Sequence, residues 1–200
     1  MLTSIFDVSP LENDEDGTSI KANPDSEDET MRQPLRLSDI VFLDLEASGL
    51  GDRCFPIEIG FIRAHDLSGW SALIRPADRW RKRGTWDHRA EALHGLDRET
   101  LESDGQDVRD VARTLNDNLA GKAVFSDAVE FDSHWLGMLF EETMERPAFD
   151  LQSVDPLFRS PDLFADLPIM SQHPADTPLQ KHRAKDDAMA LALQFRQQIK

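Results

Sequence analysis

The order of the hydrophobic patterns along the chain limits its fold more than any other feature of the sequence. Apolar runs typical of β-strands come first, at residues 40–45, 56–64 and 68–75. Patterns with helical spacing and patterns with strand character then alternate. Strands followed by alternating helices and strands predict an α/β sandwich that is built around a mixed sheet.

The second half of the chain supplies the alternating elements. Apolar residues three or four apart predict helices, and short apolar runs predict the strands between them. A Pro-rich stretch, residues 155–178, is expected to be a loop with short helical pieces. The expected elements are helices over residues 108–119, 131–143 and 184–198, and strands over residues 122–126 and about 149–151.

Length and charge divide the chain into two parts. A chain of 200 residues is long enough for one domain and a tail. Residues 1–35 hold nine acidic and two basic residues and show no hydrophobic period, which predicts a disordered acidic leader. Residues 36–200 are expected to form the domain. The leader is either a solvated tail or a segment that competes with a polyanionic substrate for a basic groove.

Composition excludes several classes of protein. The single cysteine, Cys54, cannot form an internal disulfide or a multi-cysteine zinc site. The chain has no apolar stretch long enough to span a membrane and no signal segment, so that we expect no membrane partner and a cytoplasmic location. A net charge of −16 argues against broad phosphate neutralisation, but a nuclease whose metal ions meet the phosphate is still compatible with it.

Two acidic residues end the first predicted strand. Because side chains alternate along a strand, Asp44 and Glu46 share one face while Leu43 and Leu45 point into the core. Two carboxylates held this close repel each other unless a cation lies between them or one is protonated. Oxygen ligands favour Mg²⁺ or Mn²⁺. The alternative is an edge strand whose acids face solvent.

Three more polar residues fall at element boundaries. Asp132 begins a helix after the strand over residues 122–126, and His182 with Asp187 opens the C-terminal helix. Each position lies at a strand end or a helix start, where the ligand-binding edge of an α/β sheet is found. We therefore expect these three side chains to meet Asp44 and Glu46.

The sequence resembles the DEDDh group of 3′–5′ exonucleases, which includes oligoribonuclease, ribonuclease T and the proofreading subunits of replicative polymerases. The resemblance covers about residues 36–200. Where relatives usually show HNxxFD, residues 127–132 read DAVEFD, which is a departure from the group. The motifs that carry the resemblance are DLEASGL at residues 44–50, PIEIG at 56–60, LHGL at 93–96 and HRAKDDA at 182–188.

This resemblance implies a ribonuclease H-like fold with a mixed five-stranded sheet flanked by helices. It implies two divalent cations, Mg²⁺ or Mn²⁺, held by Asp44, Glu46, Asp132 and Asp187. His182 is then the base that takes a proton from the attacking water. The branch of the superfamily that uses tyrosine in this role is excluded because the chain contains no tyrosine. The neighbouring Asp186 competes with Asp187 for the metal, and the spacing in relatives favours Asp187.

The same resemblance places substrate contacts after the first strand and at LHGL. Gly49 allows a close approach of the backbone, and Leu50 is expected to wedge or stack against the terminal base. An ordinary turn with a packed leucine is the equal alternative for Leu50. The predicted substrate-binding residues at these two places are Ala47, Ser48, Gly49, Leu50 and His94.

One basic segment stands out from the acidic background. Residues 75–89 interleave six basic residues with Trp80 and Trp86 in what looks like a loop. Cations for phosphates and aromatic faces for bases favour binding of single-stranded nucleic acid, with Arg81 and Arg83 as contacts. The alternative is a solvated loop in which nearby acids pair with the bases.

The leading prediction is a metal-dependent 3′–5′ exonuclease that trims single-stranded RNA or DNA and releases nucleoside monophosphates. A catalytically silent module that binds nucleic acid, or has a regulatory role, is the main alternative. A metal hydrolase of small phosphate esters is a third candidate. Sequence leaves open the choice of RNA or DNA, the substrate length and the oligomeric state, for which a homodimer is one option.

Overall fold

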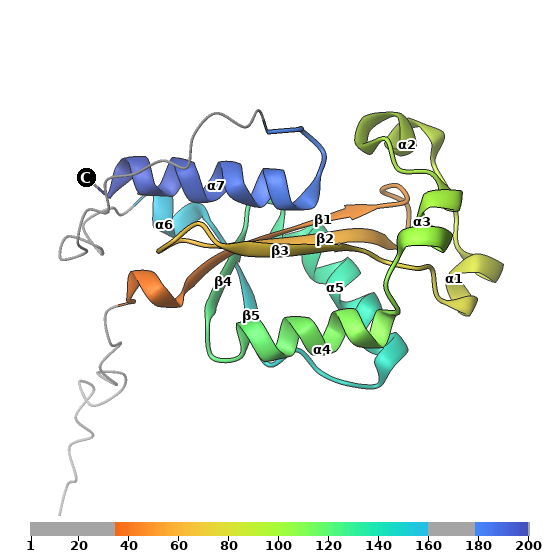
Figure 1. Cartoon of the computed structure of the whole chain (residues 1–200), viewed down its shortest axis with the longest axis horizontal. Helices are drawn as coiled ribbons and strands as arrows, with labels where there is room; N and C mark the ends of the chain where they lie inside the picture. The colour runs from red at the N-terminus through yellow and green to blue at the C-terminus, as the bar shows by residue number, and fades with distance from the viewer. Residues whose placement is uncertain (1–34, 160–178, 200) are drawn as a thin grey trace, which may run out of the picture. The chain divides into compact units, whose positions relative to one another are not determined.

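A mixed sheet forms the centre of the protein in the computed structural model, which describes residues 35–159 and 179–199 (Figure 1). Its strands lie in the order β3-β2-β1-β4-β5. β1 pairs antiparallel with β2 and parallel with β4, so that it lies in the middle of the sheet. The strands are β1 (Ile40–Ala47), β2 (Pro56–Arg63), β3 (Gly69–Leu73), β4 (Ala123–Ser126) and β5 (Asp150–Ser153).

Helices surround this sheet, and they include the three long ones that the sequence predicts. The acid-rich strand is central and not at an edge, because β2 and β4 flank it. The α/β class and the mixed sheet of five strands are therefore confirmed. The helices are α1 (Asp78–Arg83), α2 (His88–His94), α3 (Arg98–Asp104), α4 (Val108–Leu119), α5 (Val129–Thr143), α6 (Asp155–Arg159) and α7 (Ala184–Gln198), with a 3₁₀ turn, η1, at Leu37–Asp39.

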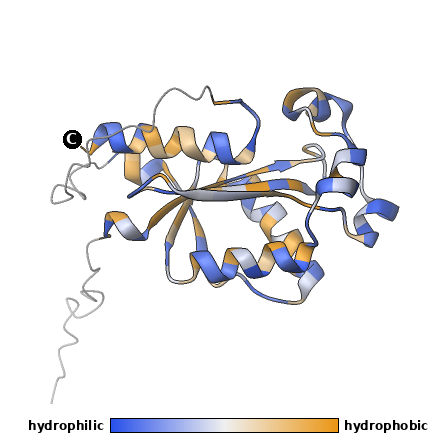
Figure 2. Cartoon of the chain, viewed as in Figure 1, coloured by the Kyte–Doolittle hydropathy of each residue, from blue (hydrophilic) through white to orange (hydrophobic). Residues whose placement is uncertain are grey.

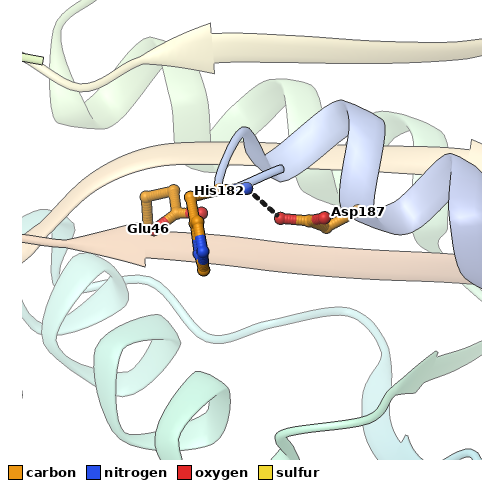
Figure 3. Close-up of side chains that lie close together, drawn as sticks. All are labelled: Glu46, His182 and Asp187. Carbon is orange, nitrogen blue, oxygen red and sulfur yellow. Dashed lines mark hydrogen bonds between the residues drawn. The ribbon is translucent and has the colours of Figure 1, made fainter. Parts of the chain in front are cut away.

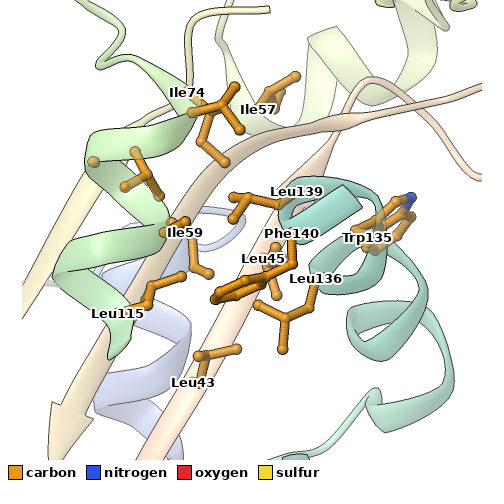
Figure 4. Close-up of a cluster of buried hydrophobic side chains, with 14 of the residues drawn as sticks. Leu43, Leu45, Ile57, Ile59, Ile74, Leu115, Trp135, Leu136, Leu139 and Phe140 are labelled. Atoms are coloured by element: carbon orange, nitrogen blue, oxygen red, sulfur yellow. The ribbon is translucent and has the colours of Figure 1, made fainter. Parts of the chain in front are cut away.

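The two faces of the sheet carry separate hydrophobic cores. α4 and α5 cover one face, where Leu43, Leu45 and Phe140 belong to the larger core (Figure 4). α7 covers the other face, where Phe42 and Phe195 pack with their ring centroids 5.5 Å apart. In Figure 1, α7 lies above the sheet and α4 lies below it. Alternate side chains of β1 thus enter different cores, as the period of a strand requires.

Apolar residues at helical spacing explain how α4 and α7 pack. In α4, Val111 and Leu115 are fully buried against the sheet, and the carboxylate of Asp107 caps the helix by accepting the backbone N–H of Arg109. In α7, Ala188 and Phe195 are buried in the same way. Figure 2 shows that apolar residues alternate with polar ones along both helices, so that each has one face for the sheet and one for solvent.

The segment between β3 and α4 differs from its prediction as a loop, since it contains α1, α2 and α3. These helices have six or seven residues each, too few for a hydrophobic period to be visible in the sequence. Side-chain caps define the starts of α2 and α3. Asp87 accepts the N–H of Arg89 at the start of α2, Asp97 accepts that of Thr100 at the start of α3, and Gly95 ends α2 with φ 71°.

Two sequence predictions fall mainly outside the described residues. The acidic leader over residues 1–35 touches them only at Leu35, and the Pro-rich stretch only at its first residues, where α6 is one of the expected short helical pieces. Among the helices of the described ranges, none combines the length and the apolar composition that crossing a bilayer requires.

Candidate active site

β1 brings two carboxylates to one end of the sheet. Ile40 and Phe42 are fully buried on the face that α7 covers, and Asp44 and Glu46 continue the same row of side chains. An apolar row that ends in two acids leaves these carboxylates under the N-terminal end of α7. The prediction that Leu43 and Leu45 point into a core is confirmed.

Asp132 reaches the same place from the first turn of α5. Its side chain is 1% exposed. The hydroxyl of Ser126, the last residue of β4, donates to its Oδ2, and the backbone N–H of Leu45 also donates to the carboxylate. These two donors hold the Asp132 carboxylate against the strand that carries Asp44.

The segment before α7 completes the group. The backbone N–H of His182 donates to Oδ2 of Asp187 over 2.8 Å. His182 has a left-handed backbone with φ 61°, which is uncommon for a residue other than glycine. One ligand atom from each of Glu46, His182 and Asp187 lies within 4.8 Å of the other two (Figure 3). Residues from β1 and α7 therefore form one compact group of potential metal ligands.

Charge repulsion and burial act together on these acids. Burial, followed by the charges of Asp132, Glu46 and Asp187, raises the pKa of Asp44 to about 10. Burial is also the largest cause of the raised pKa values of Glu46 and Asp132, both to about 7, and of the raised pKa of Asp187. The charges of the three other predicted metal ligands thus act on Asp44, which places the four carboxylates close to one another.

The donor set fits divalent cations. Four carboxylates with a single imidazole beside them offer hard oxygen ligands, which Mg²⁺ and Mn²⁺ prefer. Without a cation, the raised pKa values show that these residues carry an uncompensated repulsion. Positive charge placed between them would remove it. Asp186 differs from Asp187, because its Oδ2 accepts the backbone N–H of Gln180.

A pocket of about 180 Å³ adjoins the carboxylates. Leu50 and Leu93 lie at its surface and are 74% and 61% exposed, while Trp135 of α5 is nearly buried. Most of the lining is apolar, with Glu46 and His182 on the side of the acids. Its lining residues are Leu45, Glu46, Ala47, Gly49, Leu50, Ala90, Leu93, His94, Trp135 and His182.

His94 offers a hydrogen-bond donor to this pocket. Its Nδ1 accepts the backbone N–H of Leu96 over 3.0 Å, which places the ring proton on Nε2. Burial lowers the pKa of His94, so that the ring is neutral. The buried Nε2 has no hydrogen-bond partner among the described residues. The ring of His94 therefore carries one buried N–H group without a partner beside the pocket.

The other residues of DLEASGL serve different purposes. The Ser48 side chain is fully buried, since its hydroxyl donates to the Thr85 carbonyl and accepts the N–H of Phe55. Ser48 thus holds the β1–β2 loop against the segment before α2 and leaves no group for a substrate. A Cβ at Gly49 would lie 2.8 Å from the Cβ of Asp87 and 2.8 Å from Sγ of Cys54, so the room that Gly49 leaves is filled by side chains of the protein itself.

The basic segment is partly neutralised by its own acids. Nε of Arg81 lies 2.6 Å from Oε1 of Glu102, and its Nη1 lies 2.7 Å from Oδ1 of Asp78. Lys82 and Arg83 are exposed and make no ion pair within the described ranges. The segment is therefore a mixture of paired and free cations, and the two predicted contacts, Arg81 and Arg83, are not equivalent.

Neither tryptophan of this segment presents an open face of the kind that was predicted. Trp80 is nearly buried and stacks on Phe55 with the ring centroids 5.7 Å apart. Trp86 donates from Nε1 to Glu91, and the guanidinium of Arg98 lies over its ring. The sequence shows that both residues are aromatic but not how far each ring is covered, and for this reason it predicts stacking surfaces here.

Sequence reasoning missed several residues around the site. Asp127, at the position where relatives usually carry histidine, raises the pKa values of Asp44 and Asp132. Glu58 was quoted only as part of PIEIG, although a lone charge inside an apolar strand signals a buried partner. Trp135, whose spacing with Phe131 and Leu139 indicates a helix, also lines the pocket.

The raised pKa values predict how the metal-free protein responds to pH. A carboxyl whose pKa is higher in the folded state binds more protons folded than unfolded, so the free energy of unfolding falls as pH rises from about 4 towards 7, and towards 10 for Asp44. In chelator, urea unfolding should show a loss on the order of several kcal/mol between about pH 5 and pH 8, since each pH unit over which a folded carboxyl stays protonated is worth about 1.4 kcal/mol. Mn²⁺ should restore this loss, and equal stability at both pH values would contradict the prediction.

Comparison with known proteins gives structural likeness without sequence likeness. No protein-family model matches the chain, and no curated protein matches its sequence. A zinc-bound complex of E. coli ExoI with single-stranded DNA has a TM-score of 0.59 at 14% identity, over 78% of this chain and 39% of that one. Exonuclease I from Methylocaldum szegediense gives a TM-score of 0.57 at 14% identity over the same shares of the two chains.

A further E. coli exonuclease I structure, in complex with a dT13 oligonucleotide, has a TM-score of 0.58 at 14% identity and covers 79% of this chain. The chain spans about two fifths of the length of the exonuclease I chains that it matches. At this level of identity, the likeness is one of fold. The protein therefore has the ribonuclease H-like fold of the exonuclease I structures, as its sequence predicts.

Proposed function

We propose that this protein is a metal-dependent 3′–5′ exonuclease of the DEDDh type, which hydrolyses single-stranded nucleic acid and releases nucleoside monophosphates. The proposed catalytic domain is residues 36–200. Asp44, Glu46, Asp132 and Asp187 would hold two divalent cations, Mg²⁺ or Mn²⁺. When bound, such ions activate water at neutral pH and neutralise charge on the reacting phosphate.

One observation carries this proposal. Four carboxylates and one imidazole, which come from β1, α5 and the N-terminal end of α7, gather beside an apolar pocket. A module that only binds nucleic acid has no use for clustered buried acids, in which burial and then the neighbouring charges raise the pKa of Asp44 to about 10. Perturbed carboxyl groups next to a pocket are typical of catalysis, and this favours the enzyme over the silent alternative.

His182 supplies the proton transfer. In the proposed reaction, an imidazole nitrogen of His182 takes a proton from the attacking water as its oxygen bonds to phosphorus. The bond between phosphorus and the 3′ oxygen of the preceding nucleotide breaks, and this oxygen gains a proton. The products are a nucleoside 5′-monophosphate and a strand shorter by one nucleotide. The position of the His182 ring beside Glu46 supports this role (Figure 3).

The adjoining pocket suits the terminal nucleotide. Leu50 and Leu93 offer exposed apolar surface at its rim, which favours contact with the face of a base. His94 Nε2–H is a neutral donor for an oxygen or nitrogen of the same nucleotide. Because the fold resembles that of exonuclease I structures in complex with single-stranded DNA over 78–79% of this chain, we propose a single strand as the substrate.

Digestion of labelled oligonucleotides tests the proposal. RNA and DNA oligomers that carry a 5′ label, single- and double-stranded, are incubated with Mg²⁺, Mn²⁺ or chelator. We expect a ladder with steps of one nucleotide on single strands, which chelator abolishes. A 3′-phosphate block should stop the reaction if the terminal nucleotide enters the pocket. Binding without any cleavage, in either metal, would favour the silent module instead.

The free cations of α1 predict a salt-dependent contribution to binding. Replacing Lys82 and Arg83 together by glutamate should weaken binding of a long single strand about 10-fold at low salt and reduce the salt slope by about 1–2, since each phosphate contact contributes about 0.7. Cleavage of a dinucleotide should not change. The matched control is Arg113→Glu on α4, the helix that covers the face of the sheet opposite α7. The same loss in the control would refute a local contact.

A further inference from the structure

Glu58 is the charged residue in the buried part of β2, whose other charged residue, Arg63, ends the strand. It lies in the middle of β2, is 3% exposed and faces the same side of the sheet as α7. Its Oε2 accepts Nε of Arg183 over 3.0 Å, and its Oε1 accepts Nη2 of Arg183 over 2.8 Å. The Oε2 atom also accepts the backbone N–H of Ala184 over 3.2 Å. This buried carboxylate is thus fully paired, as its burial requires.

The partner of Glu58 directly follows His182. Arg183 is the N-cap residue of α7, and Ala184 is the first residue of the helix. On the other side, the N–H of His182 is tied to Asp187 within the same segment. His182 therefore lies between two anchors, one from its own helix and one from β2. Its left-handed backbone, with φ 61°, depends on such support, because this conformation is unfavourable for most side chains.

β2 also makes room for this end of α7. A Cβ at Gly60, two residues after Glu58, would lie 2.5 Å from the backbone nitrogen of Lys185. The start of α7 therefore packs directly on the backbone of β2. Contact at Gly60 sets how close the helix comes, and the forked contact between Glu58 and Arg183 sets its orientation, since the guanidinium plane admits one bidentate geometry.

Glu58 lies opposite Glu46 in the register of β1 and β2. Despite this position, its two oxygens are occupied by Arg183 and Ala184, and it is not one of the three residues that form the compact ligand group. Its hydrogen bonds go to the segment that follows His182, although its charge also helps to raise the pKa of Glu46. This separates Glu58 from the four acids that are proposed as metal ligands.

We propose that Glu58 is a positioning residue, which acts through Arg183 to hold His182 at the reacting centre. This inference rests on the proposed function and names a residue on which the proton transfer depends. Loss of the forked contact should let the 182–183 segment move, while the metal ligands on β1 and α5 stay in place. The expected result is a lower kcat with little change in KM or in metal affinity.

Glu58→Gln and Arg183→Lys test this role, each in the wild-type and in the His182→Ala background. In the wild-type background, either change should lower kcat about 10- to 100-fold, with KM for the oligonucleotide and Mn²⁺ affinity within about 3-fold. In the His182→Ala background, measured in single turnovers with excess enzyme, neither should lower the rate further. Glu102→Gln, which breaks the exposed forked pair with Arg81, is the matched control and should leave kcat unchanged.

The two proposals fail in different ways. If the wild-type protein cleaves no oligonucleotide, the proposed function is wrong. If it cleaves, but Glu58→Gln lowers the rate by the same factor with and without His182, then Glu58 supports the fold and not His182. Arg183→Lys keeps the charge on a half-exposed side chain and loses only the fork, so it decides the question if Glu58→Gln does not fold.

Discussion

Replacing Asp44 by asparagine is expected to lower the rate of oligonucleotide hydrolysis by roughly 10³-fold or more, because a metal site that supplies several kcal/mol of stabilisation loses its central carboxylate. Asp44 is the acid whose pKa responds to all three of the other proposed ligands. The measurement is the single-turnover rate on a labelled single strand in Mg²⁺ and in Mn²⁺.

The same substitution should stabilise the metal-free protein. An asparagine keeps the shape of the side chain and removes a charge that burial and three neighbours oppose. We expect a gain of about 1–2 kcal/mol in the free energy of unfolding in chelator at about pH 8, and a flatter dependence on pH. A loss of activity together with a gain of stability is what we expect for a carboxylate that serves metal binding and not the fold. A loss of both would indicate that Asp44 serves the fold.

A matched pair of neighbours provides the control. Asp186 and Asp187 are adjacent in the first turn of α7, but only Asp187 belongs to the compact ligand group. Asp187→Asn should reduce hydrolysis strongly, whereas Asp186→Asn should change it less than about 3-fold, because the Asp186 side chain accepts the exposed backbone N–H of Gln180 and lies outside the compact ligand group. Equal losses in both variants would contradict the assignment of the metal ligand.

Replacing His182 by alanine is expected to lower kcat by about 10²- to 10⁴-fold, the range that is typical for the loss of a general base. His182 also counts geometrically among the potential metal ligands, so activity alone cannot separate the two roles. Binding of Mn²⁺, measured by titration calorimetry, does so. If His182 is the base, its removal should leave the Mn²⁺ affinity almost unchanged. If His182 is a metal ligand, its removal should lower that affinity.

The pH–rate profile gives a second criterion for His182. If an imidazole takes the proton, the acidic limb of the wild-type profile should disappear in His182→Ala and return in part with added imidazole. His65→Ala removes a histidine that pairs with Asp66 beyond the end of β2 and is the control. A profile with the same acidic limb in His182→Ala would assign the proton transfer to another group.

Much of the fold was predictable because it is encoded by local periodicity. The residues of β1 that enter the two cores alternate in the sequence as they do in the strand, and Ala188 and Phe195 show the helical period of α7. The short helices α1 to α3 were not predictable in this way. Their charged residues obey no period, and their boundaries are set by single capping contacts such as that of Asp97.

The candidate site was also predictable only in part. Motif spacing predicted which residues gather, since Glu46, His182 and Asp187 do meet. What each side chain contacts was harder to predict, because it depends on segments that are distant in the sequence. The hydroxyl of Ser48 is hydrogen-bonded to Thr85 and Phe55, and the guanidinium of Arg81 forms an ion pair with Glu102. Such partners become visible only when the strands and helices are placed.

The proposed metal ligands come from both layers of the protein. Asp132 is carried by α5 on one face of the sheet, and Asp187 by α7 on the other, with Asp44 between them on β1. Synthesis produces α7 after every other described element, so a nascent chain without α7 carries three of the four proposed metal ligands but lacks Asp187 and the preceding His182. The proposed site is therefore complete only once α7 has docked on the sheet.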